Sequence, residues 1–383
     1  MGLKSSLKHA ALLGAASAER LFIPGTKPSL HACRNFLLLQ YATALGTTVH
    51  ATPLVRALKE ARPDANISVA ANSLALPLYA FHPAVDSVVA TPSPLTDLRE
   101  AISILRDANL FAGEPFVAIT TLGNERTRVA LALAMSGPVV RVGFTEAPEL
   151  YQATLRLDPR RSVIENNLRI VELFGYGPKR FEPEVHFREE DLQWAKDALQ
   201  KSGVRGGQMV VAFVTQTSVT QRKGWRAKRF QAAARHMIER YGAHVIFVGT
   251  ESESVAIETI RAGLCNATST FAGKTTLLQL TALLSLCRVG LTLDTGILHL
   301  GRAIGLPMAI IAPAWSPPIE WLPLGDPRYR ILKNSDMPFA PQNYIIDEVS
   351  AEEAIAALDE LVAEFPDGPT QLPFSAERAN RAT

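Results

Sequence analysis

Residues 289–307 read VGLTLDTGILHLGRAIGLP. The first five of these residues form an apolar run that predicts a buried strand, and the segment that starts at Ile297 has the spacing of a short helix. Asp294, Thr295 and Gly296 therefore fill a turn between a strand and a helix. Open parallel sheets bind ligands at the carboxyl ends of their strands. The stretch thus predicts an α/β domain with a ligand site at this turn.

The alternation of short apolar runs with amphipathic segments extends outward from this stretch in both directions, which is typical of a parallel sheet covered by helices. Glycine just past several of the helices fits the left-handed conformation that ends helices. Strands are expected at 36–40, 67–71, 116–120, 139–143, 209–215, 245–249, 289–293 and 308–312, and helices at 48–60, 125–135, 230–241, 253–262, 277–287, 297–304 and 351–364.

The chain of 383 residues suits two domains of ordinary size. Around residues 188–207 the pattern becomes polar and helical and then rich in glycine, which indicates a domain boundary. The predicted organisation is an N-terminal extension over 1–33, a first domain over 34–190, a second domain over 206–345, a C-terminal helix over 346–366 and a flexible tail over 367–383.

Composition narrows the class of protein. A net charge of +2, without a basic run in the body of the chain, argues against a nucleic-acid partner. The three cysteines, Cys33, Cys265 and Cys287, match no zinc spacing and are interpreted as reduced thiols of a cytoplasmic protein. The apolar runs are broken by Gly and Pro and are shorter than the roughly 18–20 residues of a membrane span.

The N-terminal segment, residues 1–22, mixes leucines with Lys4, Lys8, His9 and Arg20 and lacks the pattern of a secretion signal. Two interpretations stay open. The segment is an extension that touches the surface of the protein, or it is an amphipathic helix that gives peripheral contact with the inner face of the plasma membrane.

Other strand ends of the second half also carry side chains suited to a nucleotide diphosphate. Thr217 and Lys223 follow the strand at 209–215, and hydroxyl and ammonium groups bind phosphate. Glu251 and Glu253 follow the next strand, where a carboxylate can accept hydrogen bonds from a ribose. His299 lies within reach of the same anion as the Asp-Thr-Gly turn. Taken singly, each is equally compatible with a solvated loop or with a capped helix and a buried histidine.

Residues 293–307 resemble the D-T-G-x-x-H-L-A-x-A-x-G-x-P stretch of glycosyltransferase family 9, the ADP-heptose:lipopolysaccharide heptosyltransferases. Residues 272–284 are similar to that family's A-G-K-T-S-L…L-A-A-L-L segment, and residues 44–58 to its opening S-A-L-G-D-x-x-H-x-x-P-x-x-x-A-L. Residues 314–323 fit a later loop of the family more loosely. The resemblance covers about residues 35–344.

The resemblance implies a GT-B fold, in which two Rossmann-like β/α domains face each other across a cleft. It also implies an inverting, metal-independent transfer of heptose or a related sugar from an ADP-heptose-like nucleotide sugar to a glycan or lipopolysaccharide-type acceptor, with no cofactor. The donor is expected in the C-terminal domain and the acceptor in the N-terminal domain.

The resemblance also assigns site residues. In the donor pocket it places Asp294, Thr295, Gly296 and His299 beside the diphosphate. Lys223 matches the phosphate-contacting lysine, and Thr215 or Thr217 the hydroxyl donors. For the glutamate that holds the ribose, Glu253 fits better than Glu251.

The acceptor side departs from the family. After the A-L-G that ends at Gly46, the family has an aspartate that looks like the general base, whereas this chain has Thr47. A threonine hydroxyl is not a base near neutral pH. His50, on the same turn of helix, is a candidate replacement because imidazole titrates in the useful range. In the family a histidine accompanies the aspartate here, so a neighbouring role for His50 stays open.

Gly46, in the first loop, is expected on the acceptor-binding side. Arg126, Arg128 and Arg141 lie near the ends of first-domain elements and are candidates for binding an anionic glycan, with solvated surface arginines as the alternative. A lipid-linked acceptor would suit a membrane-touching N-terminal segment.

Three functions compete. The first is the sugar transferase. The second is a nucleotide-sugar or glycan-binding protein that kept the donor pocket and lost the base at Thr47. The third is a sugar-nucleotide epimerase or hydrolase of similar fold. A dinucleotide-dependent dehydrogenase is disfavoured because no G-x-G-x-x-G follows the first strand of either domain.

Overall fold

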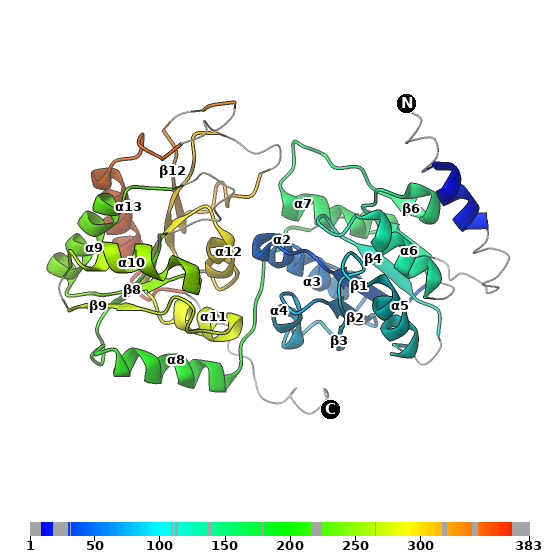
Figure 1. The fold of residues 1–383 in the computed structure, drawn as a ribbon, viewed down its shortest axis with the longest axis horizontal. Helices are drawn as coiled ribbons and strands as arrows, with labels where there is room; N and C mark the ends of the chain where they lie inside the picture. The colour runs from blue at the N-terminus through cyan, green and yellow to red at the C-terminus, as the bar shows by residue number, and fades with distance from the viewer. Residues whose placement is uncertain are drawn as a thin grey trace. The chain divides into compact units, whose positions relative to one another are not determined.

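The computed structural model describes residues 9–17, 30, 32–108, 110–111, 114–136, 140–177, 179–215, 224–264, 266–315, 320–334, 336–338 and 344–369. These residues form two compact units, the first ending at Glu184 and the second beginning at Val185 (Figure 1). The division falls before helix α8 (Glu189–Lys201), so the polar helical segment near the expected boundary belongs to the second unit.

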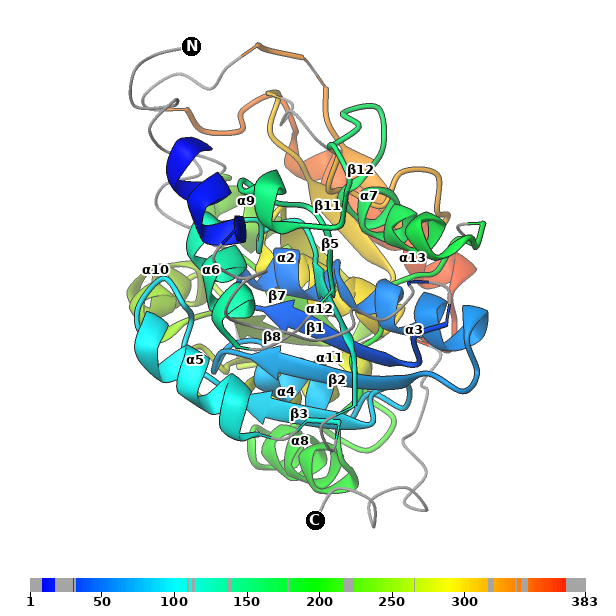
Figure 2. The ribbon, with the colours of Figure 1, turned by 90° about the vertical axis from the view of Figure 1, so that its right-hand side faces the viewer.

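The first unit is built on a parallel sheet in the order β3-β2-β1-β4-β5-β6. In Figure 2, β1, β2 and β3 lie side by side. The chain builds the sheet outward from β1 to β3 and then returns to place β4 on the other side of β1. The strands are β1 (Asn35–Gln40), β2 (Asn66–Ala71), β3 (Ser87–Ala90), β4 (Val117–Thr120), β5 (Val140–Gly143) and β6 (Ala153–Thr154).

Successive side chains of β1 point to opposite faces of this sheet, as in any strand. Leu37 and Leu39 pack with Leu105 and Leu133 of the helices on one face, whereas Phe36 meets Phe174 edge to face, with ring centroids 5.3 Å apart. The helical segments of this unit are α2 (Leu45–Val49), α3 (Thr52–Ala61), α4 (Leu76–Ala80), α5 (Leu98–Asp107), α6 (Thr127–Met135), η1 (Pro148–Leu150), α7 (Val163–Leu168) and η2 (Arg169–Phe174).

The single helix expected over 48–60 is in fact two helices, α2 and α3. The break has a local cause at Pro53, which has no N–H to donate to the carbonyl of Val49. The Thr52 hydroxyl donates to that carbonyl instead, at 2.8 Å, and proline occupies the first turn of α3, where its missing N–H costs nothing.

Residues 9–17 are helical and pack on the first unit beside α6, as Figures 1 and 2 both show. Leu12 and Ala16 are buried against Ala130 and Leu150. Of the two interpretations of the N-terminal segment, the described part follows the one in which it covers the protein's own surface.

The second unit repeats the architecture, with a parallel sheet in the order β12-β11-β10-β7-β8-β9. Phe213 and Leu291 pack in a core with residues of α9 and α13. Trp225 also belongs to this core, and its Nε1 donates to the Val349 carbonyl at 2.9 Å. The elements after α8 are β7 (Val210–Val214), α9 (Ala227–Tyr241), β8 (His244–Val248), η3 (Glu251–Glu253), α10 (Ser254–Arg261), β9 (Thr268–Thr270), α11 (Leu277–Ser285), β10 (Val289–Leu293), α12 (Gly296–Ala303), β11 (Met308–Ile311), β12 (Tyr329–Leu332) and α13 (Ala351–Glu364).

The fold class expected from the sequence, α/β with two Rossmann-like units, is confirmed by these two parallel sheets. Within the described ranges, no helix combines the length and apolar character that crossing a bilayer demands.

Candidate functional site

In the second unit, β7 and β10 are neighbours from which the chain departs in opposite directions. From β7 it continues to β8 and β9, and it then returns to build β10, β11 and β12 on the other side. At such a switch point the connections after the two strands part and leave room for a ligand. Val214 is level with Thr292 and with Val248 across the sheet, so the residues that follow β7, β8 and β10 share one edge.

Thr215 is the first residue after β7 at this edge. Its side chain is only 2% exposed, yet among the described residues its Oγ1 finds no hydrogen-bond partner. Leaving a buried hydroxyl without a partner costs about 1–3 kcal/mol. By contrast, Thr292 on the neighbouring strand donates to the Leu293 carbonyl at 2.8 Å. The free Thr215 hydroxyl therefore fits a polar ligand group bound at the switch point.

The Asp-Thr-Gly turn lies directly after β10, as expected. Thr295 caps α12, with its Oγ1 accepting from the Ile297 N–H at 3.2 Å. The start of a helix favours an anion through its N–H groups and dipole. Asp294 is 7% exposed, and His299 is buried one turn into α12, its ring centroid 6.2 Å from that of Trp321. Asp294, Thr295 and Gly296 therefore follow β10 at the same sheet edge at which Thr215 follows β7, and His299 lies one turn along α12.

Glu253 lies at the third strand end of this edge. Its Oε2 accepts from the Thr250 N–H at 2.7 Å and folds back over Gly249, the residue after β8. Glu251 is exposed, and its backbone is packed against Gly273, which has a φ of +68°. Glu253 is therefore the carboxylate held at the strand end, which keeps it as the candidate for a ribose. Thr217 and Lys223 lie outside the described residues.

The first unit has a switch point of its own, between β1 and β4. Gln40 Nε2 donates to Thr121 Oγ1 at 3.2 Å, and the Tyr41 N–H donates to Asn124 Oδ1 at 2.6 Å. The loop after β4 is thereby fastened over the end of β1, where α2 begins. Thr47, half-buried on α2, touches this loop at Gly123, and Gly46 beside it is buried.

His50 ends α2 and has only 1% of its surface exposed. Its carbonyl accepts from Asn167 Nδ2 at 3.3 Å, while Asn167 Oδ1 accepts from the Leu122 N–H at 3.0 Å. One buried amide of α7 therefore fixes both loops of this switch point. Such enclosure suits a positioning role for His50 better than proton exchange with a large acceptor.

The three arginines expected to meet an acceptor are placed differently from one another. Arg126 is exposed and pairs with Glu146 at 2.8 Å. Arg128 is exposed and donates to the Leu95 carbonyl at 2.6 Å. Arg141 is buried within β5, with its Nε donating to the Leu150 carbonyl, so its guanidinium holds η1 in place.

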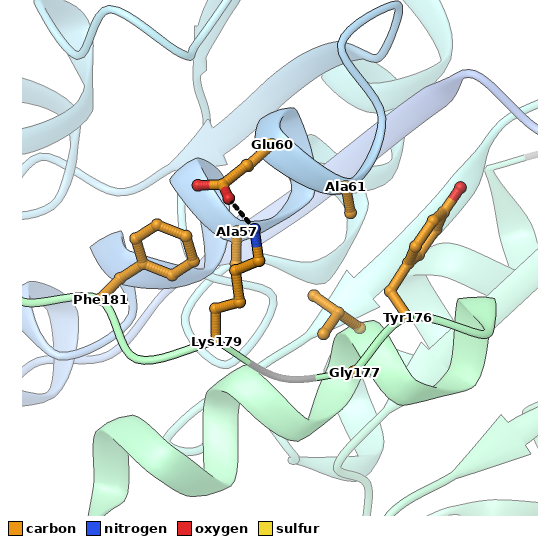
Figure 3. A pocket seen from close by; sticks show the side chains of 8 residues that line it. Ala57, Glu60, Ala61, Tyr176, Gly177, Lys179 and Phe181 are labelled. Atoms are coloured by element: carbon orange, nitrogen blue, oxygen red, sulfur yellow. Dashed lines mark hydrogen bonds and ion pairs between the residues drawn. The ribbon is translucent and has the colours of Figure 1, made fainter.

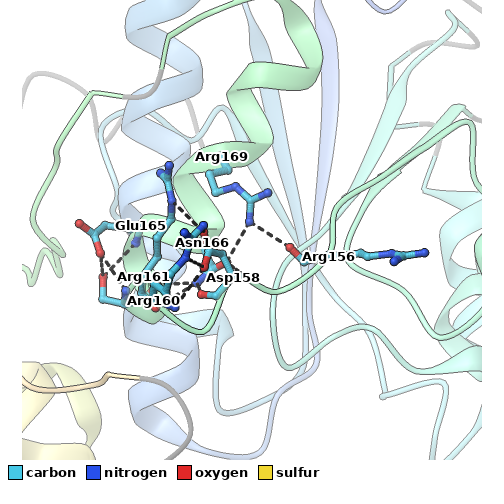
Figure 4. Close-up of polar contacts among 8 residues, drawn as sticks. Arg156, Asp158, Arg160, Arg161, Glu165, Asn166 and Arg169 are labelled. Atoms are coloured by element: carbon cyan, nitrogen blue, oxygen red, sulfur yellow. Dashed lines mark hydrogen bonds and ion pairs between the residues drawn. The ribbon is translucent and has the colours of Figure 1, made fainter.

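A basic cluster that sequence reasoning missed lies after β6, at the carboxyl edge of the same sheet (Figure 4). It comprises Arg160, Arg161 and Arg169, whose guanidinium groups outnumber the carboxylates of Asp158 and Glu165 by one. The side chain of Arg156 points away from this cluster, and its carbonyl accepts from Arg169 Nη1 at 2.9 Å. The hydrogen bond from Arg160 holds the pKa of the Asp158 carboxyl well below its usual range. The signal was the R-x-D-x-R-R run at 156–161, directly after a strand.

A pocket of about 290 Å³ lies elsewhere on the first unit (Figure 3). It is lined by the last turn of α3 and by Val171, Tyr176, Gly177, Lys179 and Phe181, and Lys179 reaches across it to Glu60. Because α3 starts at the carboxyl edge of the sheet, its last turn lies at the opposite edge. None of the predicted site residues lines this pocket.

Comparisons with known proteins identify the family of the chain. The family model of glycosyltransferase family 9 (heptosyltransferase) matches residues 121–336, more than half of the chain. The match includes the Asp-Thr-Gly turn, whereas residues 44–58 lie outside it. A search of the curated proteins gave no match.

Several solved structures share the fold. A glycosyl transferase family 9 protein from Veillonella parvula DSM 2008 has 19% identity and a TM-score of 0.78, over 88% of this chain and 100% of that chain. The ADP-heptose lps heptosyltransferase II of E. coli has 16% identity and a TM-score of 0.70, over 86% and 98% of the two chains. The E. coli heptosyltransferase WaaC, solved with ADP, has 15% identity and a TM-score of 0.62, over 86% and 98%.

At these identities the likeness establishes the fold, which is that of the heptosyltransferases, and the family model supplies the membership. The chain belongs to glycosyltransferase family 9, the heptosyltransferase family.

Proposed function

We propose that this protein is an inverting, metal-independent glycosyltransferase that takes a heptose or a related sugar from a nucleotide-diphosphate sugar. The observation that carries the proposal is the Thr215 hydroxyl, buried without a partner at the switch point of the second unit beside the Asp-Thr-Gly turn. An ADP-heptose-like donor is favoured because the similar E. coli enzyme was solved with ADP and with ADP-2-deoxy-2-fluoro heptose.

The donor's diphosphate is the leaving group, and negative charge builds on it as the bond to the anomeric carbon breaks. In this proposal the Thr215 hydroxyl and the N–H groups at the start of α12 stabilise that charge, and preorganised donors of this kind lower reaction barriers by several kcal/mol. The carboxylate of Glu253, already fixed by the Thr250 N–H, accepts hydrogen bonds from the ribose.

The acceptor in this proposal is an anionic glycan that binds the first unit. The basic cluster of Arg160, Arg161 and Arg169 supports an acid-bearing saccharide, since guanidinium groups bind carboxylates and phosphates in a bidentate manner. A lipopolysaccharide-type acceptor carries such groups.

A second candidate is a nucleotide-sugar-binding protein without transferase activity. Thr47 favours it, because a half-buried threonine methyl against Gly123 occupies the position where the resemblance expects a carboxylate. The two candidates share the donor pocket and differ in turnover.

Calorimetric titration with ADP-, GDP-, UDP- and dTDP-sugars tests the donor pocket. One donor class should bind to the wild type and lose affinity in Asp294→Ala, Lys223→Ala and Thr215→Val, while Arg128→Ala, in the first unit, should bind it normally. A folded protein that binds none of these donors would contradict the proposal.

A further inference from the structure

Glu125 is a carboxylate of the first unit that the fold leaves unused. It lies on the loop between β4 and α6 and is half-buried. Its Oε2 is enclosed and accepts no hydrogen bond from the described residues. An enclosed carboxylate oxygen without a donor is costly in free energy, and a catalytic role or a bound ligand is one of the few reasons for a protein to retain it.

The other carboxylates on the loops that follow β4, β5 and β6 are all engaged. Each accepts a hydrogen bond or forms an ion pair: Glu146 with Arg126, Glu149 with His9, Asp158 with Arg160, and Glu165 with Ser162. Glu149 keeps its Oε2 enclosed without a donor, but its Oε1 is held by His9, so within the described part of these loops Glu125 is the carboxylate that makes neither a hydrogen bond nor an ion pair.

The loop that carries Glu125 is fixed at the switch point. Asn124, the preceding residue, binds the Tyr41 N–H at the end of β1, and Gly123 touches Thr47. Two residues span at most about 7 Å, so the side chain of Glu125 starts close to Thr47. Thr127, two residues further on, has a second enclosed hydroxyl without a partner in the described structure. Two enclosed oxygens without a partner therefore lie on one short segment, and both lack the donor or acceptor that a polar ligand group would supply.

We propose that Glu125 is the general base of the transfer and that its carboxylate takes the place left by Thr47. This inference rests on the proposed transferase function. In the step, the acceptor oxygen forms a bond to the anomeric carbon of the donor. The bond from that carbon to the diphosphate oxygen breaks, and its electron pair leaves with the diphosphate. The acceptor's hydroxyl proton moves to the Glu125 carboxylate.

The roles of the neighbouring residues follow. Thr47 cannot take the proton, because an alcohol is too weak a base at neutral pH. His50 is only 1% exposed as a whole residue, whereas Glu125 has one enclosed oxygen but is only partly buried as a residue. The Thr127 hydroxyl is placed to hydrogen-bond the same acceptor or the carboxylate itself.

The test measures ADP release from ADP-heptose, with water as the acceptor, across pH 4 to 9. Glu125→Gln should lower the rate by about 10²–10⁴-fold, the usual worth of a general base, and should abolish the acidic limb of the pH–rate profile. Glu125→Asp keeps the carboxylate and should recover part of the rate with that limb intact. Glu146→Gln, which removes a neighbouring carboxylate already paired with Arg126, should keep the wild-type rate and profile.

Calorimetric donor binding separates the two proposals. Glu125→Gln should bind ADP-heptose as the wild type does, since Glu125 belongs to the first unit and the donor residues to the second. Equal rates and profiles in the wild type and Glu125→Gln, with donor bound, would overturn the base alone. Donor binding without any ADP release by the wild type would also count against a working base. Loss of donor binding in the wild type would overturn the transferase and, with it, this inference.

Discussion

Gly123 and Thr47 are in such close contact that a Cβ atom on Gly123 would lie 2.4 Å from Thr47 Cγ2. Gly123 also has a φ of +87°, a conformation that other L-residues rarely adopt. The loop after β4 and the helix after β1 are thus fitted together through a glycine.

Gly123→Ala should therefore destabilise the first unit by about 1–3 kcal/mol, because both the backbone conformation and the contact oppose a methyl group. Denaturant unfolding measures the change. The matched control is Gly206→Ala, where no atom lies within 4 Å of the added carbon and the expected change is within about 0.5 kcal/mol. Equal stability of the two variants would contradict the close contact.

Thr47→Asp should rescue Glu125→Gln. In the single variant Glu125→Gln no carboxylate is left at the switch point, and Thr47→Asp supplies one from the adjoining helix. ADP release by the double variant should exceed that of Glu125→Gln by at least tenfold. In the wild-type background the same change should give little gain, because two nearby carboxylates oppose each other's ionisation. A protein that only binds its ligand would stay inactive in every combination.

Thr215→Val should affect stability and binding in opposite directions. Replacing a buried hydroxyl without a partner by a methyl group leaves the free energy of unfolding unchanged or raises it by up to about 1 kcal/mol. Donor affinity should fall by about 10- to 100-fold, since a hydrogen bond to a charged group contributes about 1.5–3 kcal/mol.

Thr292→Val is the control for this pair of effects. It removes a hydroxyl that donates to the Leu293 carbonyl, so it should lower stability by about 1 kcal/mol and leave donor affinity unchanged. Thermal unfolding measures the stability of both variants, and calorimetric titration measures their affinity for the donor. Unaltered donor affinity in Thr215→Val would remove Thr215 from the pocket.

Leu12→Asp should disrupt the packing of helix 9–17 against α6. Leu12 is 5% exposed against Ala130 and Ala134, and burying a carboxylate there costs about 2–4 kcal/mol or expels the helix. Leu13→Asp, next to it but 48% exposed, should be nearly neutral. Limited proteolysis near the N-terminus and denaturant unfolding would report both. Equal behaviour of the two variants would argue against the packing of this helix.

Glu165 should make the first unit sensitive to acid. The carboxylate of Glu165 accepts a hydrogen bond from the Ser162 N–H, and this bond lowers the pKa of Glu165 below its ordinary value. A lowered folded-state pKa gives stability that is present above the unfolded value, about 4.3, and is lost as the pH falls through the folded value. Urea unfolding between pH 6 and 3 should show a smaller pH dependence in Glu165→Gln than in the wild type. Identical pH dependence would contradict the assignment.

The sequence predicted the helices and strands whose buried side chains form a clear apolar stripe or run. Helix α13 spans Ala351–Glu364 as expected, because Ser350 and Glu353 form a capping box ahead of an apolar stripe. The turn after β10 was predicted for the same reason, a fully buried strand followed by a capping threonine. Strand β3 was missed, since its four residues are partly exposed and show no run of buried side chains.

The site was only partly readable for a different reason. Residues that follow a strand can be identified one strand at a time, and this located Asp294 and Glu253. The state of Glu125 depends on which neighbours satisfy the other carboxylates, and that is set by contacts between distant segments such as Glu149 and His9. The burial of Arg141 likewise depends on η1, which no local pattern indicated.

The helix at residues 9–17 has a consequence for the order of events during synthesis. Its apolar residues Leu12 and Ala16 leave the ribosome well before Leu150, a main partner, has been made. At 5–20 residues per second the delay is on the order of ten seconds. During that interval Leu12 and Ala16 are exposed on the nascent chain, where a chaperone can bind them. The packing of the first unit is complete only when helix 9–17 docks on the later residues.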